Sequence, residues 1–524
     1  MVLGCCLLPI PELSLLLLAV VLLTLLLADI KKPPGYPPGP AWFPVVGTYL
    51  QHRQLQREYG YLHEVWRSLS RQYGAVVGLR LGRDRVVVVS GAAAVREVLT
   101  HSAFDGRPDG FFFRLRCFGE RLGVVFTEGE HWQEQRRFAV RVLKQFGLGG
   151  RSMEEQVAEE AAELVTALRA RVLAARGADG CVAMAHAFDV SVLNSLWAML
   201  AGRRFALDDE RLAGLLHTLN DCFRQTDGSG GLLNQMPFLR HLAPRRCGYT
   251  DTVRNLNKLW DFLRETIVEH EQTRVPTKPR DLIDAFLEEM QGRKGTDSTG
   301  STYTEKQLLS LLLDLFMAGA ETTSNTLGFT VMFLLRRPDV QRRAQEELDR
   351  VVGRGRQPSL QDRPRLNYLE AVLKEAQRLA NVAPVGVPHR AMQNATIMGH
   401  TVPKDTTVLA SLWSVHMDRE YWGDPERFRP ERFLDDAGLK SAEYLLPFGL
   451  GKRRCLGEKL ARSNLFMFLA FLLHHFSMEP CPKHPVGDPI EDRHFLDGFT
   501  LCPKPFCALL TARDAATEHA DGQG

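Results

Sequence analysis

The chain has 524 residues, of which 45% are hydrophobic and 24% charged. This length and balance exclude a disulfide-stapled miniprotein, a fibre and a disordered chain, and they predict a globular protein with a large core. The 65 Lys and Arg residues nearly balance the 62 Asp and Glu residues, which leaves a net charge of +3. Bulk charge therefore gives no reason to expect nucleic acid or an acidic polymer as a partner.

The first thirty residues are typical of a membrane anchor, which we place at residues 1–30. Leu13 to Ala28 carries no charge, and as a helix it would be about 24 Å long, slightly short of a bilayer core. A cleaved signal peptide is the alternative, but no basic segment precedes the apolar run and no A-x-A site follows it. Because Lys31 and Lys32 follow the span, the positive-inside rule places the rest of the chain on the cytosolic side.

Residues 31–44 predict a hinge. The segment 33–40 reads PPGYPPGP, and its fixed φ angles and missing donors favour a stiff extended spacer that holds a folded body off the bilayer. The cysteines form no C-x-x-C pair and no regular spacing. A zinc cage or a disulfide framework is therefore unsupported, and we expect the thiols to remain reduced.

Periodicity predicts one mainly helical domain with a small β part over residues 45–513, followed by a frayed polar tail at 514–524. Two β-rich runs at 75–81 and 85–90 are separated by Gly82-Arg83-Asp84 and predict a hairpin. Spaced apolar positions with charges between them predict amphipathic helices at 153–176, 249–274, 339–352 and 366–379.

Residues 308–335 predict a long central helix, about 42 Å from end to end. A second membrane span is the alternative, but Asp314, Glu321 and Asn325 would be costly in lipid, whereas a core helix can aim them at a cavity. The segment 318–323 reads AGAETT. Its small residues would let a flat ligand approach the backbone, and its acid and hydroxyl could relay protons, although a mid-helix threonine often only bonds back to a carbonyl one turn earlier.

Cys455 lies in the segment FGLGKRRCLGE at 448–458, directly before a helical pattern at 459–474. Three nearby cations and the start of a helix are expected to lower the pKa of its thiol, as a metal-bound thiolate requires. The glycines would let the loop pass close under a flat macrocycle. The alternative is a basic surface loop with an incidental cysteine.

This cysteine loop, F-x-x-G-x-R-x-C-x-G, resembles the haem-binding loop of the cytochrome P450 superfamily. Other marks of the family occur in the same order and cover residues from about 30 to 510. The sequence KEAQR at 374–378 resembles the E-x-x-R helix. PERF at 425–428 resembles the loop that follows it, so the resemblance implies that Arg427 completes an ion network with Glu375 and Arg378.

The resemblance also implies a set of site residues. Cys455 is expected to ligate the iron of haem b as a thiolate, and Thr322 with Glu321 is expected to deliver protons to bound oxygen. The other residues expected to contact the haem are Trp132, Arg136, Ala318, Gly319, His389, Phe448, Gly451, Arg453 and Gly457.

The function implied by this resemblance is that of a haem-thiolate monooxygenase in the endoplasmic reticulum membrane. It would insert one oxygen atom from O₂ into a lipophilic small molecule, by hydroxylation or epoxidation. Electrons would come from NADPH through NADPH–cytochrome P450 reductase, with cytochrome b5 as a further candidate partner. A basic face would dock the reductase or would be ordinary solvated charge; it comprises Arg136, Arg137, Arg141, Lys144, Lys452 and Arg454.

The sequence says less about the substrate. DGRPDGFFFR at 105–114, with segments 146–149 and 153–155, resembles an insect microsomal branch of the family that includes methyl farnesoate epoxidases. A terpenoid such as methyl farnesoate is therefore our candidate, with steroid or xenobiotic oxidation as the alternative. Two other hypotheses remain open: a haem-thiolate binding or sensing protein without turnover, and a two-span membrane protein without haem.

Overall fold

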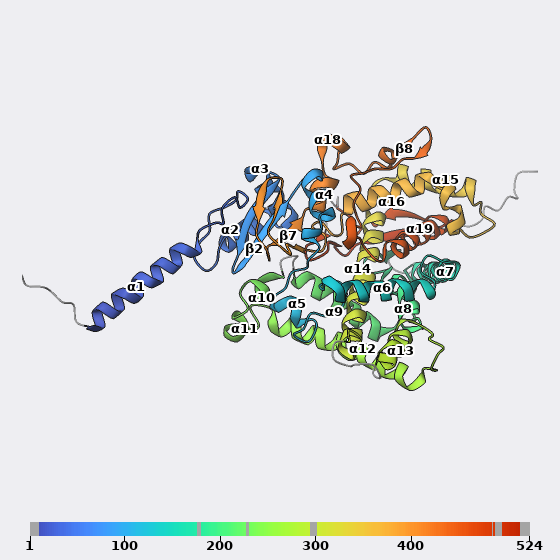
Figure 1. The fold of residues 1–524 in the computed structure, drawn as a ribbon. Helices are drawn as coiled ribbons and strands as arrows, with labels where there is room; N and C mark the ends of the chain where they lie inside the picture. Colours follow the sequence, from blue (N-terminus) through green and yellow to red (C-terminus); the bar gives the residue numbers. More distant parts are fainter. Residues whose placement is uncertain are drawn as a thin grey trace, which may run out of the picture.

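Helices make up most of this computed structural model, and a small sheet lies at the end of the body from which α1 extends (Figure 1). The structure describes residues 10–175, 180–226, 230–293, 301–484, 486–487 and 495–513. The predicted tail at 514–524 and the first nine residues of the anchor lie outside the described residues. The predicted fold class, mainly α with a small β part in one catalytic domain, is confirmed.

The predicted long helices form within a few residues of their expected bounds. The helices are α1 (Ile10–Asp29), α2 (Tyr49–Tyr59), α3 (Leu62–Tyr73), α4 (Ala92–Thr100), α5 (Phe111–Leu115), α6 (Gly129–Gln145), α7 (Arg151–Ala175), α8 (Asp189–Ala201), α9 (Glu210–Gln225), α10 (Gly231–Gln235), α11 (Leu239–Leu242), α12 (Tyr249–Thr273), α13 (Leu282–Arg293), α14 (Glu305–Arg336), α15 (Pro338–Val351), α16 (Asn367–Ala380), α17 (Leu412–His416), α18 (Arg419–Trp422) and α19 (Glu458–His475).

The predicted hairpin is confirmed as β1 (Val76–Leu81) and β2 (Asp84–Val89), joined by a turn with Gly82 at φ +59°. In the sheet order β1-β2-β7-β4, β7 (Thr407–Ala410) runs parallel to β2, and β4 (His389–Arg390) runs antiparallel to β7. A second sheet has the order β10-β13-β3. It consists of β10 (Phe476–Pro480), β13 (Cys507–Ala512) and β3 (Cys181–Ala183).

Three two-stranded ribbons complete the β part of the described chain. They pair β5 (Ala395–Ile397) with β6 (His400–Val402), β8 (Leu434–Asp435) with β9 (Gly438–Leu439), and β11 (Phe495–Leu496) with β12 (Cys502–Pro503).

The central helix α14 packs against α8, α16 and α19 and runs through the middle of the body (Figure 1). It begins where the Thr304 side chain accepts a hydrogen bond from the backbone N–H of Gln307, which satisfies one free donor of the first turn. Nearly every side chain along it is buried. The prediction of a core helix rather than a second membrane span is therefore confirmed.

At the N-terminus, α1 extends away from the body as a single helix with exposed leucines such as Leu15, Leu17 and Leu18 (Figure 1). Within the part of the chain that could be searched, the structure contains no helix that combines the length and apolar character needed to cross a membrane.

The proline-rich segment 33–40 begins with a turn, in which the backbone N–H of Tyr36 donates to the carbonyl oxygen of Pro33 at 3.1 Å, and it packs against the hairpin rather than standing free. The Tyr36 hydroxyl lies 3.1 Å from the carbonyl oxygens of both Leu79 and Val86. A Cβ atom on Gly39 would lie 2.2 Å from the carbonyl oxygen of Gly78, so this close approach requires glycine. The hinge is thus part of the folded body.

Cys181 and Cys481 form a disulfide, contrary to the expectation that the thiols remain reduced. The two cysteines are 300 residues apart, so their spacing in the sequence carries no signal. They meet because β13 pairs with both β10 and β3, which places Cys181 beside the end of β10. The remaining cysteines of the described chain, including Cys455, are free.

We predict that this disulfide stabilises the oxidised protein. Reduction with dithiothreitol should lower the free energy of unfolding by about 2–4 kcal/mol, because the cross-link restricts the unfolded chain. The measurement is denaturant unfolding with and without reductant, alongside a peptide map under non-reducing conditions. A Cys181→Ser/Cys481→Ser variant should be insensitive to reductant, and equal sensitivity in both proteins would contradict the assignment.

Candidate active site

The cysteine loop leads into α19 and is closed by a hydrogen bond from the backbone N–H of Cys455 to the carbonyl oxygen of Phe448, at 2.9 Å. Cys455 is exposed, and a Cβ atom on Gly457 would point into open space. Gly451, at φ +68°, serves another purpose: its Cβ would lie 2.1 Å from the carbonyl oxygen of Leu99 in α4. The loop therefore packs tightly on α4 and stays open beside the thiol.

The prediction that neighbouring charges lower the pKa of Cys455 is wrong for the chain alone. Although the residue is exposed, the protein atoms packed around Cys455 desolvate its thiol and raise the pKa, and the charge of Glu458 raises it further; hydrogen bonds from the backbone N–H groups of Gly457 and Glu458 and the charge of Arg136 act to lower it. The Arg454 side chain instead pairs with Glu458 at 2.6 Å. A thiolate at Cys455 consequently depends on a bound metal ion, which deprotonates its thiol ligand.

An indole and two guanidinium groups gather beside this loop. Trp132 and Arg136 lie one turn apart on α6, and the guanidinium carbons of Arg136 and Arg453 lie 5.6 Å and 3.9 Å from the centroid of the Trp132 ring. Arg453 donates hydrogen bonds to the carbonyl oxygens of Asp105, at 2.8 Å, and Thr127, at 2.7 Å. The predicted residues Trp132, Arg136 and Arg453 thus form one cluster, with all three near the cysteine loop.

His389 and Arg107 extend this cluster. Nδ1 of His389 lies 2.7 Å from the carbonyl oxygen of Phe104. Burial, together with the charges of Arg107 and Arg453, holds the pKa of His389 well below its usual range. The imidazole is therefore neutral, and its Nδ1–H donates to that carbonyl.

From the sequence, Arg107 had no role beyond its place in the segment 105–114, which resembles the insect branch. Its Nη1 donates to the carbonyl oxygens of Val387 and Pro388, and its Nε is buried without a hydrogen-bond partner among the described residues. Burial and the charges of Arg453 and Arg136 lower the pKa of Arg107 well below its usual range. This excess of buried positive charge calls for an anionic ligand.

One face of the otherwise buried helix α14 is open. Ala318 is exposed, and Met317 and Thr322 are half-buried, although the helix lies in the centre of the body (Figure 1). Ala318 and Thr322 share a face because they are one turn apart, and the Thr322 hydroxyl donates to the Ala318 carbonyl oxygen at 2.9 Å. We call the internal space beside Ala318 and Thr322 the chamber.

Gly319 is half-buried and also lies against a neighbouring helix. A Cβ at this position would lie 2.3 Å from Cδ2 of Leu196 on α8. The glycine therefore allows two helices to approach each other, and the small residue that faces the chamber is Ala318.

Glu321, next to Thr322, is buried in a polar cluster. Its Oε1 accepts hydrogen bonds from Arg224 at the end of α9, from the Thr500 hydroxyl at 2.8 Å and from the Asn325 amide at 3.1 Å. Burial raises the pKa of Glu321 to about 7, although the positive charge of Arg224 acts to lower it. Glu321 can therefore exchange a proton near neutral pH. Arg224 and Thr500 were missed from the sequence because both are far from the helix in the chain.

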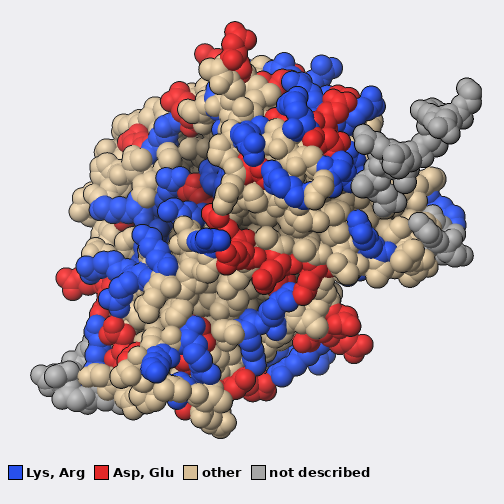
Figure 2. Space-filling model, turned by 90° about the vertical axis from the view of Figure 1, so that its right-hand side faces the viewer, with Lys and Arg blue, Asp and Glu red and all other residues tan. Residues whose placement is uncertain are grey.

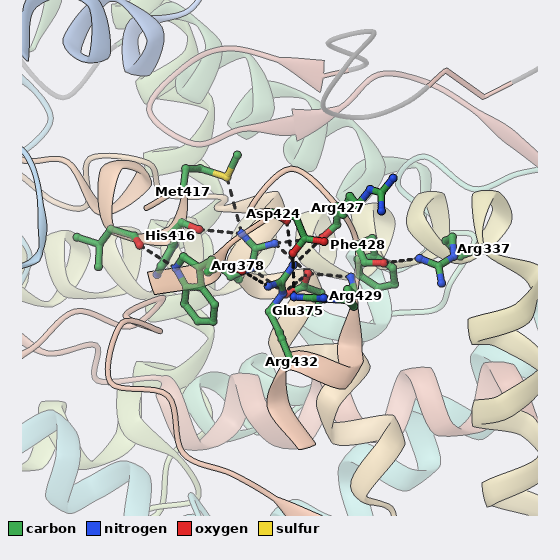
Figure 3. Close-up of polar contacts among 12 residues, drawn as sticks. Arg337, Glu375, Arg378, His416, Met417, Asp424, Arg427, Phe428, Arg429 and Arg432 are labelled. Atoms are coloured by element: carbon green, nitrogen blue, oxygen red, sulfur yellow. Dashed lines mark hydrogen bonds and ion pairs between the residues drawn. The ribbon is translucent and has the colours of Figure 1, made fainter. Parts of the chain in front are cut away.

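Behind the cysteine loop, Glu375 and Arg378 on α16 form a fully buried ion pair, with Arg378 Nε 2.7 Å from Glu375 Oε2 (Figure 3). The prediction that Arg427 completes this network is wrong. Arg432 Nε lies 3.0 Å from Glu375 Oε1, whereas Arg427 is exposed and contributes its carbonyl oxygen. The signal was present in the sequence, because PERF occurs again at 430–433.

The ion network is connected to the cysteine loop through His416. Arg378 donates to the His416 carbonyl oxygen at 2.8 Å, and His416 Nε2 accepts from the backbone N–H of Leu446 at 2.9 Å. Burial and the charge of Arg378 lower the pKa of His416 to about 3, so the ring is neutral at ordinary pH. Leu446 lies shortly before Phe448, so these contacts fix the start of the loop.

These residues fit a haem group. Cys455 is the one exposed cysteine among the described residues and offers its sulfur to iron, and the surplus of guanidinium groups around Trp132 offers partners for the two propionate carboxylates. The open face of α14 and the absence of a side chain at Gly457 leave space for a flat macrocycle.

Comparison with known proteins agrees with this fit. The family model for Cytochrome P450 matches residues 37–509. The chain is 41% identical to Farnesoate epoxidase from Bombyx mori over 479 residues, which is 91% of this chain and 94% of the relative. It is 39% identical to Probable cytochrome P450 303a1 from Drosophila melanogaster over 498 residues, 94% and 97% of the two chains. Cytochrome P450 2J5 from Mus musculus is 36% identical over 507 residues, 95% and 96% of the two chains.

We predict that the two PERF arginines differ sharply in their effect on stability. Arg432→Ala should cost about 3–5 kcal/mol, because it removes a buried partner of Glu375. The matched control Arg427→Ala should stay within about 0.5 kcal/mol of the parent, because that side chain is exposed. Denaturant unfolding measures both values. Equal losses, or a larger loss for Arg427→Ala, would show that the network is misassigned.

We also predict an acid-labile contribution from His416. Its pKa falls from 6.5 in the unfolded chain to about 3 in the folded one, so the unfolded state takes up a proton first as the pH drops. Stability from this residue is present above pH 6.5 and is lost below it by about 1.4 kcal/mol per pH unit. Unfolding measured between pH 7 and pH 5 should have a shallower pH dependence in His416→Gln.

The exposed residue His217 supplies the control for this measurement. His217→Gln should keep the parent pH dependence, since its ring is largely in solvent. The same pH dependence in His416→Gln and the parent would mean that His416 is not buried as a neutral ring.

Proposed function

The chain belongs to the cytochrome P450 family and is a haem-thiolate monooxygenase, and we propose that it oxidises a farnesoate-type terpenoid with electrons supplied by a reductase. The main support for this substrate is the 41% identity to Farnesoate epoxidase over 91% of this chain. The open face of α14 at Ala318 and Thr322 is compatible with it, because a substrate must reach a space beside the reacting group.

We assign the haem to the space between the cysteine loop and the open face of α14. Cys455 would hold the iron through its sulfur, while Phe448, Gly451 and Gly457 shape the loop around it. Arg136, Arg453 and Trp132 would bind the propionate carboxylates, with His389 and Arg107 behind them. When bound, the haem supplies the activation of O₂, with one oxygen atom going to the substrate and the other leaving as water.

Thr322 and Glu321 are proposed to handle the protons that this reaction consumes. Thr322 holds a hydroxyl at the chamber, one turn from Ala318 on the same face of α14. Oε2 of Glu321 is buried and has no hydrogen-bond partner among the described residues, so this oxygen can carry a proton. Because the pKa of Glu321 is about 7, the carboxyl group can be reprotonated after each transfer at neutral pH.

For the electrons, we propose NADPH–cytochrome P450 reductase as the donor, with cytochrome b5 as a second one. Arg137 and Lys144 on α6 are exposed near the cysteine loop, whereas Arg141 pairs with Glu289 and Lys452 with Asp105. Figure 2 shows the side of the molecule opposite α1, on which acidic and basic side chains are interspersed. Exposed positive charge such as that of Arg137 and Lys144 attracts an acidic partner.

The location follows from the same reasoning. We propose that residues 1–30 anchor the protein in the endoplasmic reticulum membrane, that 31–44 form the hinge, and that the domain at 45–513 faces the cytosol, with a tail at 514–524. The exposed leucines of α1 support the anchor, since they have no partner surface in the body among the described residues.

The test is reconstitution of the full-length chain with reductase and NADPH in lipid vesicles. The substrates offered are farnesoic acid, methyl farnesoate, a steroid and a drug-like probe. We expect NADPH-dependent oxidation of a farnesoate compound, and the Cys455→Ser variant should lose both this activity and the red-shifted absorbance of the reduced carbon monoxide adduct. Cys247→Ser is the matched control and should retain both. Oxidation of the steroid or probe alone would contradict the substrate assignment.

A further inference from the structure

Arg116 and Asp314 form a buried ion pair one turn along α14 from Ala318, and Arg116 contacts Met317 beside it. Arg116 directly follows α5, and its Nη2 lies 2.9 Å from Oδ1 of Asp314 on α14, with the two side chains 8% and 1% exposed. Oδ2 of Asp314 accepts hydrogen bonds from the backbone N–H groups of Val124, at 2.7 Å, and Val125, at 2.9 Å. The carboxylate is thus fixed in place, and it holds the guanidinium group of Arg116 in position.

The guanidinium of Arg116 has donor capacity that the described chain does not use. It carries five N–H donors. Besides the ion pair, Nη2 lies 3.6 Å from the sulfur of Met317, and the guanidinium carbon lies 5.1 Å from the centroid of the Phe126 ring. Nη1 is buried and has no hydrogen-bond partner among the described residues. Buried donors are normally satisfied, so this atom calls for an acceptor brought by a ligand.

The position of the pair suits one end of an elongated substrate. Asp314, Ala318 and Thr322 follow one another at single-turn spacing on one face of α14. The pair is therefore displaced along the helix by about 6 Å from Ala318 and about 12 Å from Thr322. Met317, which Arg116 contacts, is half-buried beside the exposed Ala318. A lipophile oxidised near Thr322 would place its far end at Arg116.

Charge decides which end group fits. Asp314 neutralises Arg116, so this pair presents no net charge to a ligand that approaches Nη1. A substrate carboxylate would add an uncompensated buried charge, which is costly. An ester carbonyl oxygen accepts a hydrogen bond from an arginine without adding charge.

We propose that Arg116 determines substrate specificity by donating from Nη1 to a neutral carbonyl group, such as that of an ester, at the end of a lipophilic substrate, and that Asp314 excludes the free acid. This inference rests on the proposed function and adds to it the end group that the chamber selects. It makes the ester of a farnesoate-type compound the preferred substrate over the acid.

The experiment compares the dissociation constants of methyl farnesoate and farnesoic acid at pH 8, from the change in haem absorbance of the full-length, haem-loaded chain. The parent should bind the ester at least tenfold more tightly than the acid. Asp314→Asn keeps the acceptor for Val124 and Val125 but leaves Arg116 with a free positive charge. It should therefore shift the ratio by at least tenfold toward the acid.

Two further variants keep the test decisive. Arg116→Met/Asp314→Asn leaves the chamber uncharged but without the donor, and it should bind the ester more weakly than the parent does. Arg114→Met is the matched control: this neighbouring arginine is exposed and pairs with Asp109 at 2.7 Å, so the parent ratio should persist. Preference of the parent for the acid, or an unchanged ratio in both Asp314 variants, would overturn the proposal.

A second pair of ligands, methyl laurate and lauric acid, separates this inference from the substrate assignment. If neither farnesoate compound binds but methyl laurate is preferred to lauric acid in the parent and not in Asp314→Asn, the proposed terpenoid substrate fails and the role of Arg116 stands. If no ester preference is seen with either pair, the role of Arg116 fails, whatever the terpenoid result.

Discussion

A single carboxylate, that of Glu375, holds together the region on which the cysteine loop depends. It lies fully buried between the guanidinium groups of Arg378 and Arg432 and also accepts the backbone N–H of Arg429 at 2.9 Å. Arg378 in turn holds the carbonyl oxygen of His416, whose ring holds the backbone of Leu446. A buried charge must be fully paired, so this chain of contacts has little freedom to rearrange. The stretch of backbone that presents Cys455 begins from that fixed point.

The two sides of the site differ in their balance of charged side chains. On the cysteine side, the side chains offer excess positive charge, and the thiol becomes a good ligand only when iron is present. On the α14 side, acids and arginines occur in matched pairs, Asp314 with Arg116 and Glu321 with Arg224. The cysteine side is therefore suited to an anionic cofactor, whereas the α14 side pairs each of these buried acids with an arginine.

Local patterns were visible in the sequence, and long-range partners were not. The hairpin at 76–89, the long helices and the cysteine loop could be predicted because each depends on residues close together in the chain. The disulfide between Cys181 and Cys481 and the contact of Arg224 with Glu321 could not, because only the assembled fold brings those residues together. The direction of the pKa shift of Cys455 was misjudged because a sequence shows the cations near a thiol. It does not show how far the folded chain removes water from around that thiol.

The docked hinge has a consequence for how the enzyme meets its partners. Asp29, at the end of α1, pairs with Arg80 of β1 at 2.7 Å, and Tyr36 is hydrogen-bonded to both strands of the hairpin. If α1 is embedded in a bilayer, these contacts would fix the tilt of the body relative to the membrane and would restrict its rotation about the segment 31–44. A redox partner in the same membrane would then diffuse in two dimensions and meet a body whose orientation is already fixed. Part of the rotational entropy cost of association would therefore be met before the two proteins come into contact.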